Sequence, residues 1–126
     1  MALAGMVLSA CAADGTTVYP TAAFAHRVAT QDVEICWNCT KLEPGLLRLD
    51  GVARNIGGQE VRFLELELDS VDGKDSSPAR AAAALPDSVL HINQVSPFHL
   101  QLPTRGNEAR FDLYYRYYLP PPASVH

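Results

Sequence analysis

Residues 110–119 read Arg-Phe-Asp-Leu-Tyr-Tyr-Arg-Tyr-Tyr-Leu. Their side chains form two different sets with period two, which is the pattern of a β-strand with two unlike faces. One set consists of Phe111, Leu113, Tyr115, Tyr117 and Leu119. The other consists of Arg110, Asp112, Tyr114, Arg116 and Tyr118. The first set predicts a core-facing side of the strand. The second predicts either another buried face or a contact surface.

Three earlier stretches alternate in the same way. Their apolar positions are Leu47, Leu49 and Gly51; Leu64, Leu66 and Leu68; and Phe98, Leu100 and Leu102. Val61 and Phe63 have the opposite parity to the leucines that follow them, so we expect a bulge near Phe63. Short strands separated by turns, without a strand–helix–strand rhythm, predict an all-β antiparallel sandwich.

Residues 77–85, Ser-Pro-Ala-Arg-Ala-Ala-Ala-Ala-Leu, allow two interpretations. Ser77 and Pro78 suit a helix cap and a first helical position, and alanine favours helix, so one short helix near 78–85 is possible. Pro86 would end such a helix. The alternative is an edge strand with small side chains.

The composition limits the possible partners. The chain has 126 residues, of which 48% are apolar and 19% charged, and ten Lys and Arg against fourteen Asp and Glu give a net charge of −4. This size fits one domain with a core of its own. A chain without a basic stripe argues against nucleic acid as a partner. No apolar run reaches the roughly 18 residues of a membrane-spanning helix.

The start of the chain suggests a cellular address. Residues 1–11 read Met-Ala-Leu-Ala-Gly-Met-Val-Leu-Ser-Ala-Cys. Their end, Leu8-Ser9-Ala10-Cys11, resembles the lipobox of bacterial lipoproteins. The resemblance implies that residues 1–10 are a signal peptide, and that the Cys11 thiol carries acyl chains such as palmitate. Ala12 in place of Asp resembles the pattern for outer-membrane delivery. We therefore expect a lipid-anchored protein of the bacterial cell envelope that faces the periplasm.

The rest of the chain divides by composition. Residues 11–30 are rich in Ala, Thr and Gly and are predicted to be the lipidated tether. The β-sandwich domain is expected over residues 31–119. Residues 120–126 begin with three prolines and form a Pro-rich tail that cannot join a sheet.

Within the predicted sandwich, several segments resemble FxLYD-type domains. These segments are residues 49–55 (Leu-Asp-Gly-Val-Ala-Arg-Asn), residues 69–73 (Asp-Ser-Val-Asp-Gly), residues 95–98 (Val-Ser-Pro-Phe) and the final aromatic strand. Where that family has Phe-x-Leu-Tyr-Asp, this chain has Leu66-Glu67-Leu68-Asp69. The resemblance covers about residues 46–118. It implies an immunoglobulin-like sandwich of an envelope protein or lipoprotein, with a role in extracytoplasmic interaction or scaffolding and without catalytic residues.

Cys36-Trp37-Asn38-Cys39 is a motif with several possible roles. A redox site would need a helix starting at the first cysteine, and Pro44-Gly45 leaves no room for one. A zinc site would need two more ligands, and the four histidines show no paired spacing. In an oxidising envelope we expect a structural Cys36–Cys39 disulfide. The alternative is an envelope thiol-disulfide or metal-binding protein that uses these two cysteines.

The remaining candidates are surface features. Glu65, Glu67 and Asp69 share a strand face and are interpreted as solvated charges rather than as an acid–base pair. Tyr114, Arg116 and Tyr118 form an aromatic and cationic stripe, and they are the candidate interface residues because Tyr and Arg are enriched at binding hot spots. Cross-strand packing is the alternative role for them. We expect no enzyme, cofactor or metal. The expected partner is another envelope protein or a larger membrane complex.

Overall fold

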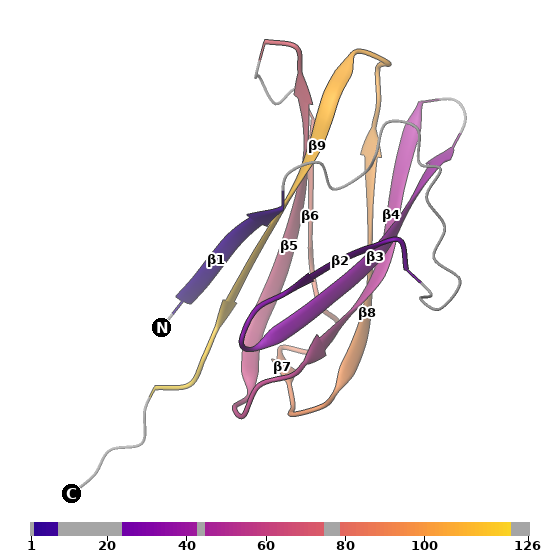
Figure 1. Cartoon of the computed structure of the whole chain (residues 1–126). Helices are drawn as coiled ribbons and strands as arrows, with labels where there is room; N and C mark the ends of the chain where they lie inside the picture. Colours follow the sequence, from indigo (N-terminus) through magenta and orange to yellow (C-terminus); the bar gives the residue numbers. More distant parts are fainter. Residues whose placement is uncertain (1, 8–23, 43–44, 75–78, 122–126) are drawn as a thin grey trace, which may run out of the picture.

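The computed structural model describes residues 2–7, 24–42, 45–74 and 79–121 (Figure 1). Its strands are β1 (Ala2–Val7), β2 (His26–Ala29), β3 (Val33–Leu42), β4 (Leu46–Asn55), β5 (Val61–Asp72), β6 (Arg80–Ala84), β7 (Val89–Leu90), β8 (Val95–Pro103) and β9 (Glu108–Tyr118). None of the residues in these ranges is helical. The all-β prediction is confirmed.

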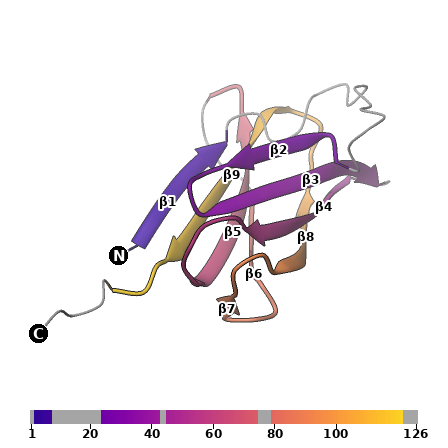
Figure 2. The same cartoon turned by 60° about the horizontal axis from the view of Figure 1, so that its bottom comes forward.

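The strands form two antiparallel sheets (Figure 2). The five-stranded sheet has the order β1-β9-β5-β6, with β7 also paired to β5, and the four-stranded sheet has the order β2-β3-β4-β8. In an immunoglobulin sandwich, strands A, B and E lie in one sheet and strands C and F in the other. Here β3, β4 and β8 hold the places of A, B and E, and β5 and β9 hold those of C and F. Strand G lies beside F in that fold, and here this place belongs to β1.

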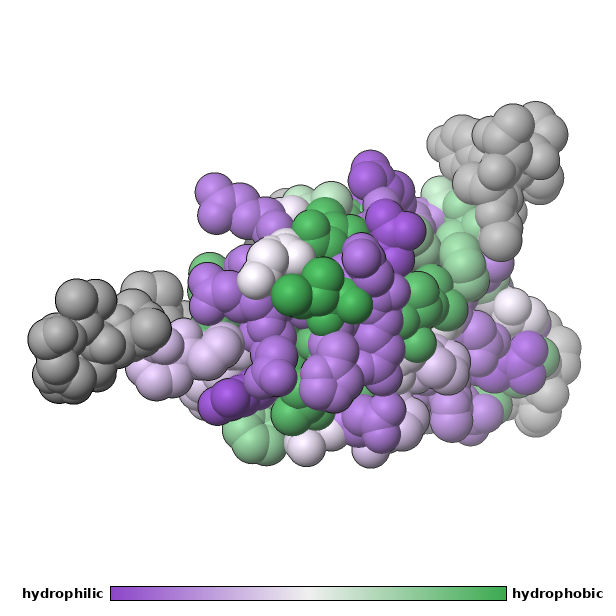
Figure 3. Space-filling model, turned by 90° about the horizontal axis from the view of Figure 1, so that it is seen from below, coloured by the Kyte–Doolittle hydropathy of each residue, from purple (hydrophilic) through white to green (hydrophobic). Residues whose placement is uncertain are grey.

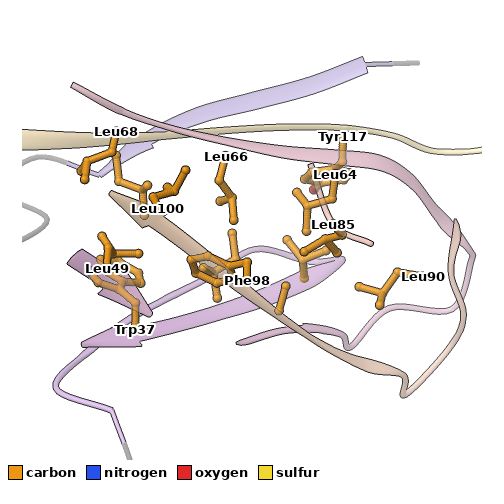
Figure 4. Packing of buried hydrophobic residues seen from close by; sticks show 14 of the residues in the cluster. Trp37, Leu49, Leu64, Leu66, Leu68, Leu85, Leu90, Phe98, Leu100 and Tyr117 are labelled. Carbon is orange, nitrogen blue, oxygen red and sulfur yellow. The ribbon is translucent and has the colours of Figure 1, made fainter. Parts of the chain in front are cut away.

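The core lies between the two sheets (Figure 4). Leu66, Leu68 and Leu113 come from the five-stranded sheet, and all three are completely buried. Trp37 and Leu49 face them from the four-stranded sheet. The apolar positions of each predicted alternation point inward, because successive side chains of a strand point to opposite faces. The alternation therefore predicted the core correctly.

The predicted bulge is present in β5. Phe63 has a φ of 55°, and the pairing of β5 with β9 shifts register between Arg62 and Glu65. The extra residue reverses the parity of the strand. Val61 and Leu64 are therefore both buried, while the Phe63 side chain is 60% exposed.

The prediction of a short helix near 78–85 is wrong for the described residues of that segment. Residues 80–84 form β6, an edge strand that pairs with residues 65–69 of β5. A helix of two turns is marginal by itself, since its nucleation is costly. Pairing with β5 satisfies the backbone and packs Ala81 and Ala83 against the core. Residues 75–78 lie outside the described residues.

The predicted boundary between the tether and the sandwich needs correction. β2 lies within the predicted tether of residues 11–30, yet residues 26–29 pair with residues 34–37 of β3. The stretch has too few apolar residues to show the period of a strand, but Val28 packs against the core and the His26 ring stacks on Trp37 at 5.5 Å between centroids. Residues 2–7, predicted to belong to the signal peptide, form β1 beside β9. Pro120 and Pro121 follow β9 outside any strand, and residues 122–126 are not described.

Candidate functional site

The stripe of Tyr114, Arg116 and Tyr118 lies on the outer face of the five-stranded sheet. These residues alternate along β9 with Leu113 and Tyr117, which are buried, so they point away from the core. Tyr114 is half-buried, and the other two are exposed. The structure thus brings the predicted interface residues to one face.

Acidic side chains of the neighbouring strand β5 lie beside the stripe. Arg116 lies opposite Glu65 of β5, and its Nη2 donates a hydrogen bond of 3.3 Å to Glu65 Oε1. Tyr114 lies opposite Glu67. A shallow pocket of about 210 Å³ opens beside these groups, where β1 contributes only small residues. Its lining residues are Ala4, Gly5, Glu65, Glu67, Tyr114, Tyr115 and Arg116.

Phe63 extends the stripe at its far end. Its ring meets Tyr118 edge-on, with centroids 6.1 Å apart and planes at 81°. Aromatic pairs prefer this arrangement. The parity break in the sequence predicted the bulge, but it did not reveal that the bulge would turn Phe63 toward β9. The sequence reasoning therefore missed Phe63 as a site residue.

An apolar surface also lies at one end of the molecule. Seen from below, the end near β7 has apolar side chains surrounded by hydrophilic ones (Figure 3). The exposed large apolar side chains of the described residues are Phe63, Ile92, Val95 and Tyr118. Two of these four belong to the aromatic pair described above.

The acidic residues of the outer face are not all solvated, contrary to the prediction. Asp69 of β5 lies directly opposite Asp112 of β9, and their exposed fractions are only 4% and 2%. Arg80 Nε lies 3.2 Å from Asp69 Oδ1, and Arg110 Nε lies 3.1 Å from Asp112 Oδ1. Each buried carboxylate therefore has its own guanidinium, as a buried charge requires.

Glu67 belongs to the same network. Partial burial raises its pKa, and the hydrogen bond and charge of Asp69 raise it further, while Arg80 acts in the opposite direction. Arg80 Nε lies 3.4 Å from Glu67 Oε2. The paired arginines balance these carboxylates, which gives them a structural role.

Cys36 and Cys39 do not form the predicted disulfide. Both lie in β3, where residues three apart point to opposite faces and are separated by roughly 10 Å. A disulfide requires Cα atoms within about 7 Å. The Cys36 thiol is free, whereas Cys39 packs on the core side and is disulfide-bonded, though not to Cys36. Burial raises the pKa of the Cys36 thiol and the nearby Glu34 carboxylate raises it further, while Arg27 and Arg54 act in the opposite direction.

Neither a metal cluster nor a membrane-spanning helix is found in the described ranges. No group of three or more His, Cys, Asp or Glu side chains there could hold a metal ion. No helix within them is long and apolar enough to cross a bilayer. The lipobox-like residues Leu8–Cys11, including the predicted lipidation site, lie outside the described residues.

Comparisons with known proteins add information on the fold. No protein-family model matches the chain, and no curated protein matches it in sequence. The structure is similar to that of envelope protein VP37 from White Spot Syndrome Virus, with a TM-score of 0.56, 14% identity and 94% of each chain covered. It also matches a DUF1425 family member from Shewanella sp. pv-4, with a TM-score of 0.41 and 18% identity over 79% of this chain and 90% of the other. At such low identity, the likeness to VP37 shows the fold alone.

Proposed function

We propose that this chain is a lipid-anchored protein of the bacterial cell envelope whose β-sandwich binds another envelope protein without catalysis. The observation that carries the proposal is the lipobox-like Leu8-Ser9-Ala10-Cys11. Acylation at Cys11 would hold the sandwich at the membrane surface, facing the periplasm. Ala12 after the cysteine favours the outer membrane. The FxLYD-type resemblance implies the same kind of role, and the all-β sandwich is compatible with it.

The outer face of β9 supports binding as the activity. Tyr118 and Tyr114 present large rings with few rotatable bonds, Arg116 adds a planar cationic group, and Phe63 enlarges the apolar part of the surface. Glu65 and Glu67 provide a polar rim beside them. This combination suits a protein partner, for example a larger membrane complex of which the chain is an accessory subunit.

Two variants on opposite sheets test the binding face. We expect that a partner co-purifies with the wild-type protein from detergent-solubilised membranes, and that Arg116→Ala combined with Tyr118→Ala removes it. Arg48→Ala is the matched control. Arg48 points outward from the four-stranded sheet, where its ion pair with Asp50 is exposed. Elution of the wild-type protein alone, or equal loss of the partner in the two variants, would contradict the proposal.

A further inference from the structure

β1 lies along the free side of β9 (Figures 1 and 2). The two strands are antiparallel, and their register runs from Ala2 opposite Tyr118 to Val7 opposite Leu113. Leu3 packs against the core beside Tyr117. β1 therefore completes the sheet at the place that strand G takes in an immunoglobulin sandwich.

The fit between β1 and β9 depends on one glycine. Gly5 lies opposite Tyr115, and a Cβ atom at Gly5 would overlap the hydroxyl and ring of that tyrosine. The Tyr115 ring also pairs with that of Tyr117, with centroids 6.3 Å apart and planes at 15°. A strand with a larger residue in this place would force the Tyr115 side chain to move, so glycine fits best opposite Tyr115.

The other sheet edges differ from β9 in a way that matters for partner binding. β8 carries Pro97 and Pro103, while β6 and β2 have only five and four residues. Prolines and short lengths are the usual means by which proteins block pairing at an edge. β9 has eleven residues and no proline, and half of its length is covered by β1 alone. Removal of β1 would leave a long and unprotected edge.

We propose that the edge of β9 is an acceptor site for an extended strand of the partner protein, which replaces β1 once residues 1–10 have been removed. This inference rests on the signal cleavage in the proposed function. The incoming strand runs antiparallel to residues 113–118, with glycine opposite Tyr115, a small residue opposite Arg116 and an aliphatic residue opposite Tyr117. Strand addition of this kind gives affinity through backbone hydrogen bonds and specificity through alternate side chains.

Two observations favour a partner strand over other occupants. The acceptor edge belongs to the same strand as the stripe of Tyr114, Arg116 and Tyr118, so one partner can contact both surfaces. The chain segment directly after β9 is a poor substitute, because Pro120 and Pro121 have no N–H group to donate. A second copy that pairs through its own β9 is the competing occupant.

The test displaces β1 in the full chain and adds a replacement strand. In Gly5→Leu the new side chain overlaps Tyr115, and in Leu3→Asp a charge faces the core, so both changes release β1. The probe is a fluorescent peptide with the sequence of residues 2–7, Ala-Leu-Ala-Gly-Met-Val. We expect both variants to bind it at least tenfold more tightly than the wild-type chain, whose site is filled. A peptide with Leu in place of Gly should bind at least tenfold more weakly than the probe.

Gly58→Leu is the matched control, because a Cβ at Gly58 meets no atom within 4 Å and β1 stays in place. Folded variants that do not bind the probe, or that bind both peptides equally, would overturn the proposal. Unfolding of both variants would also overturn it, because the sandwich could not then exist without β1. Dimers that exclude the probe would overturn it in favour of a second copy as the occupant. The assay requires no lipidation, so a failed anchor would leave its result unchanged.

Discussion

Tyr117 joins the two sheets through its hydroxyl group. The ring is buried in β9, and the hydroxyl donates a hydrogen bond of 2.8 Å to Asp32 Oδ2 near the start of β3. Thr30 Oγ1 lies 3.2 Å from the same hydroxyl. We expect Tyr117→Phe to lower the free energy of unfolding by about 1–2 kcal/mol, since it removes the hydrogen bonds but keeps the ring. Urea unfolding followed by the fluorescence of Trp37 measures this change. An unchanged midpoint would contradict the assigned role of the hydroxyl.

The same residue predicts a loss of stability at alkaline pH. Burial raises the pKa of Tyr117 to about 12, and the hydrogen bond to the Asp32 carboxylate contributes. The folded state therefore favours the neutral phenol. The resulting stability is present below the ordinary pKa of about 10 and is lost as the pH rises toward 12. We expect a smaller loss of stability between pH 10 and 12 in Tyr117→Phe than in the wild type. Identical pH profiles would show that the phenol does not titrate in this way.

Arg110 stabilises the fold by pairing with the buried carboxylate of Asp112. Asp112 has an exposed fraction of 2% and depends on this guanidinium, while the carboxylate of Asp69 lies across the strand. We expect Arg110→Leu to destabilise the fold by about 1–3 kcal/mol, because a buried charge loses its partner. Adding Asp112→Asn to this variant should restore most of the lost stability, because the buried charge is then removed. Thermal unfolding of the single and double variants checks this, and equal stability of the two would contradict it.

At the scale of elements, the bulge in β5 places a phenylalanine in an unfavourable backbone conformation. Phe63 has a φ of 55°, a region that costs about 1 kcal/mol or more for a residue with a Cβ atom. Its side chain is 60% exposed, so removing it loses little burial. We expect Phe63→Gly to be more stable than Phe63→Ala by about 1 kcal/mol, as measured by urea unfolding. Equal stability would show that the bulge relaxes when the aromatic ring is absent.

The period of the side chains predicted some elements and missed others, for a physical reason. β4, β5, β8 and β9 each bury one face, so apolar and polar residues alternate along their sequences. β2 and β6 are short edge strands with few large apolar residues, so tertiary pairing determines their conformation. The opposite orientations of Cys36 and Cys39 follow from β3, a strand that is not among those predicted from the sequence.

The part of the candidate site on β9 could be predicted from the sequence, and the part on β5 could not. The alternation in β9 placed Tyr114, Arg116 and Tyr118 on one face. The addition of Phe63 and the opposition of Asp69 to Asp112 depend on the register between β5 and β9, which the bulge sets. Such long-range register is not encoded in either strand alone.

At the scale of the whole molecule, segments from both ends of the chain meet in one sheet. Residues 2–7 are apolar and small, a composition that suits both a signal peptide and a strand packed beside Tyr115. The sequence suggested only the first role, because the second depends on contacts with residues more than a hundred positions away. Under the proposed signal cleavage the two roles would follow one another, with β1 on the edge of β9 before cleavage and a partner strand there after it.

Metabolic labelling with a palmitate analogue in a bacterial host tests the proposed lipidation at Cys11. The wild-type chain, Cys11→Ser and Cys36→Ser are compared after separation of membranes from soluble proteins, with Cys36→Ser as the control for a free thiol elsewhere. We predict that the wild type and Cys36→Ser carry the label and sediment with membranes, and that Cys11→Ser does neither. Labelled Cys11→Ser protein, or an unlabelled wild type, would contradict lipidation at Cys11.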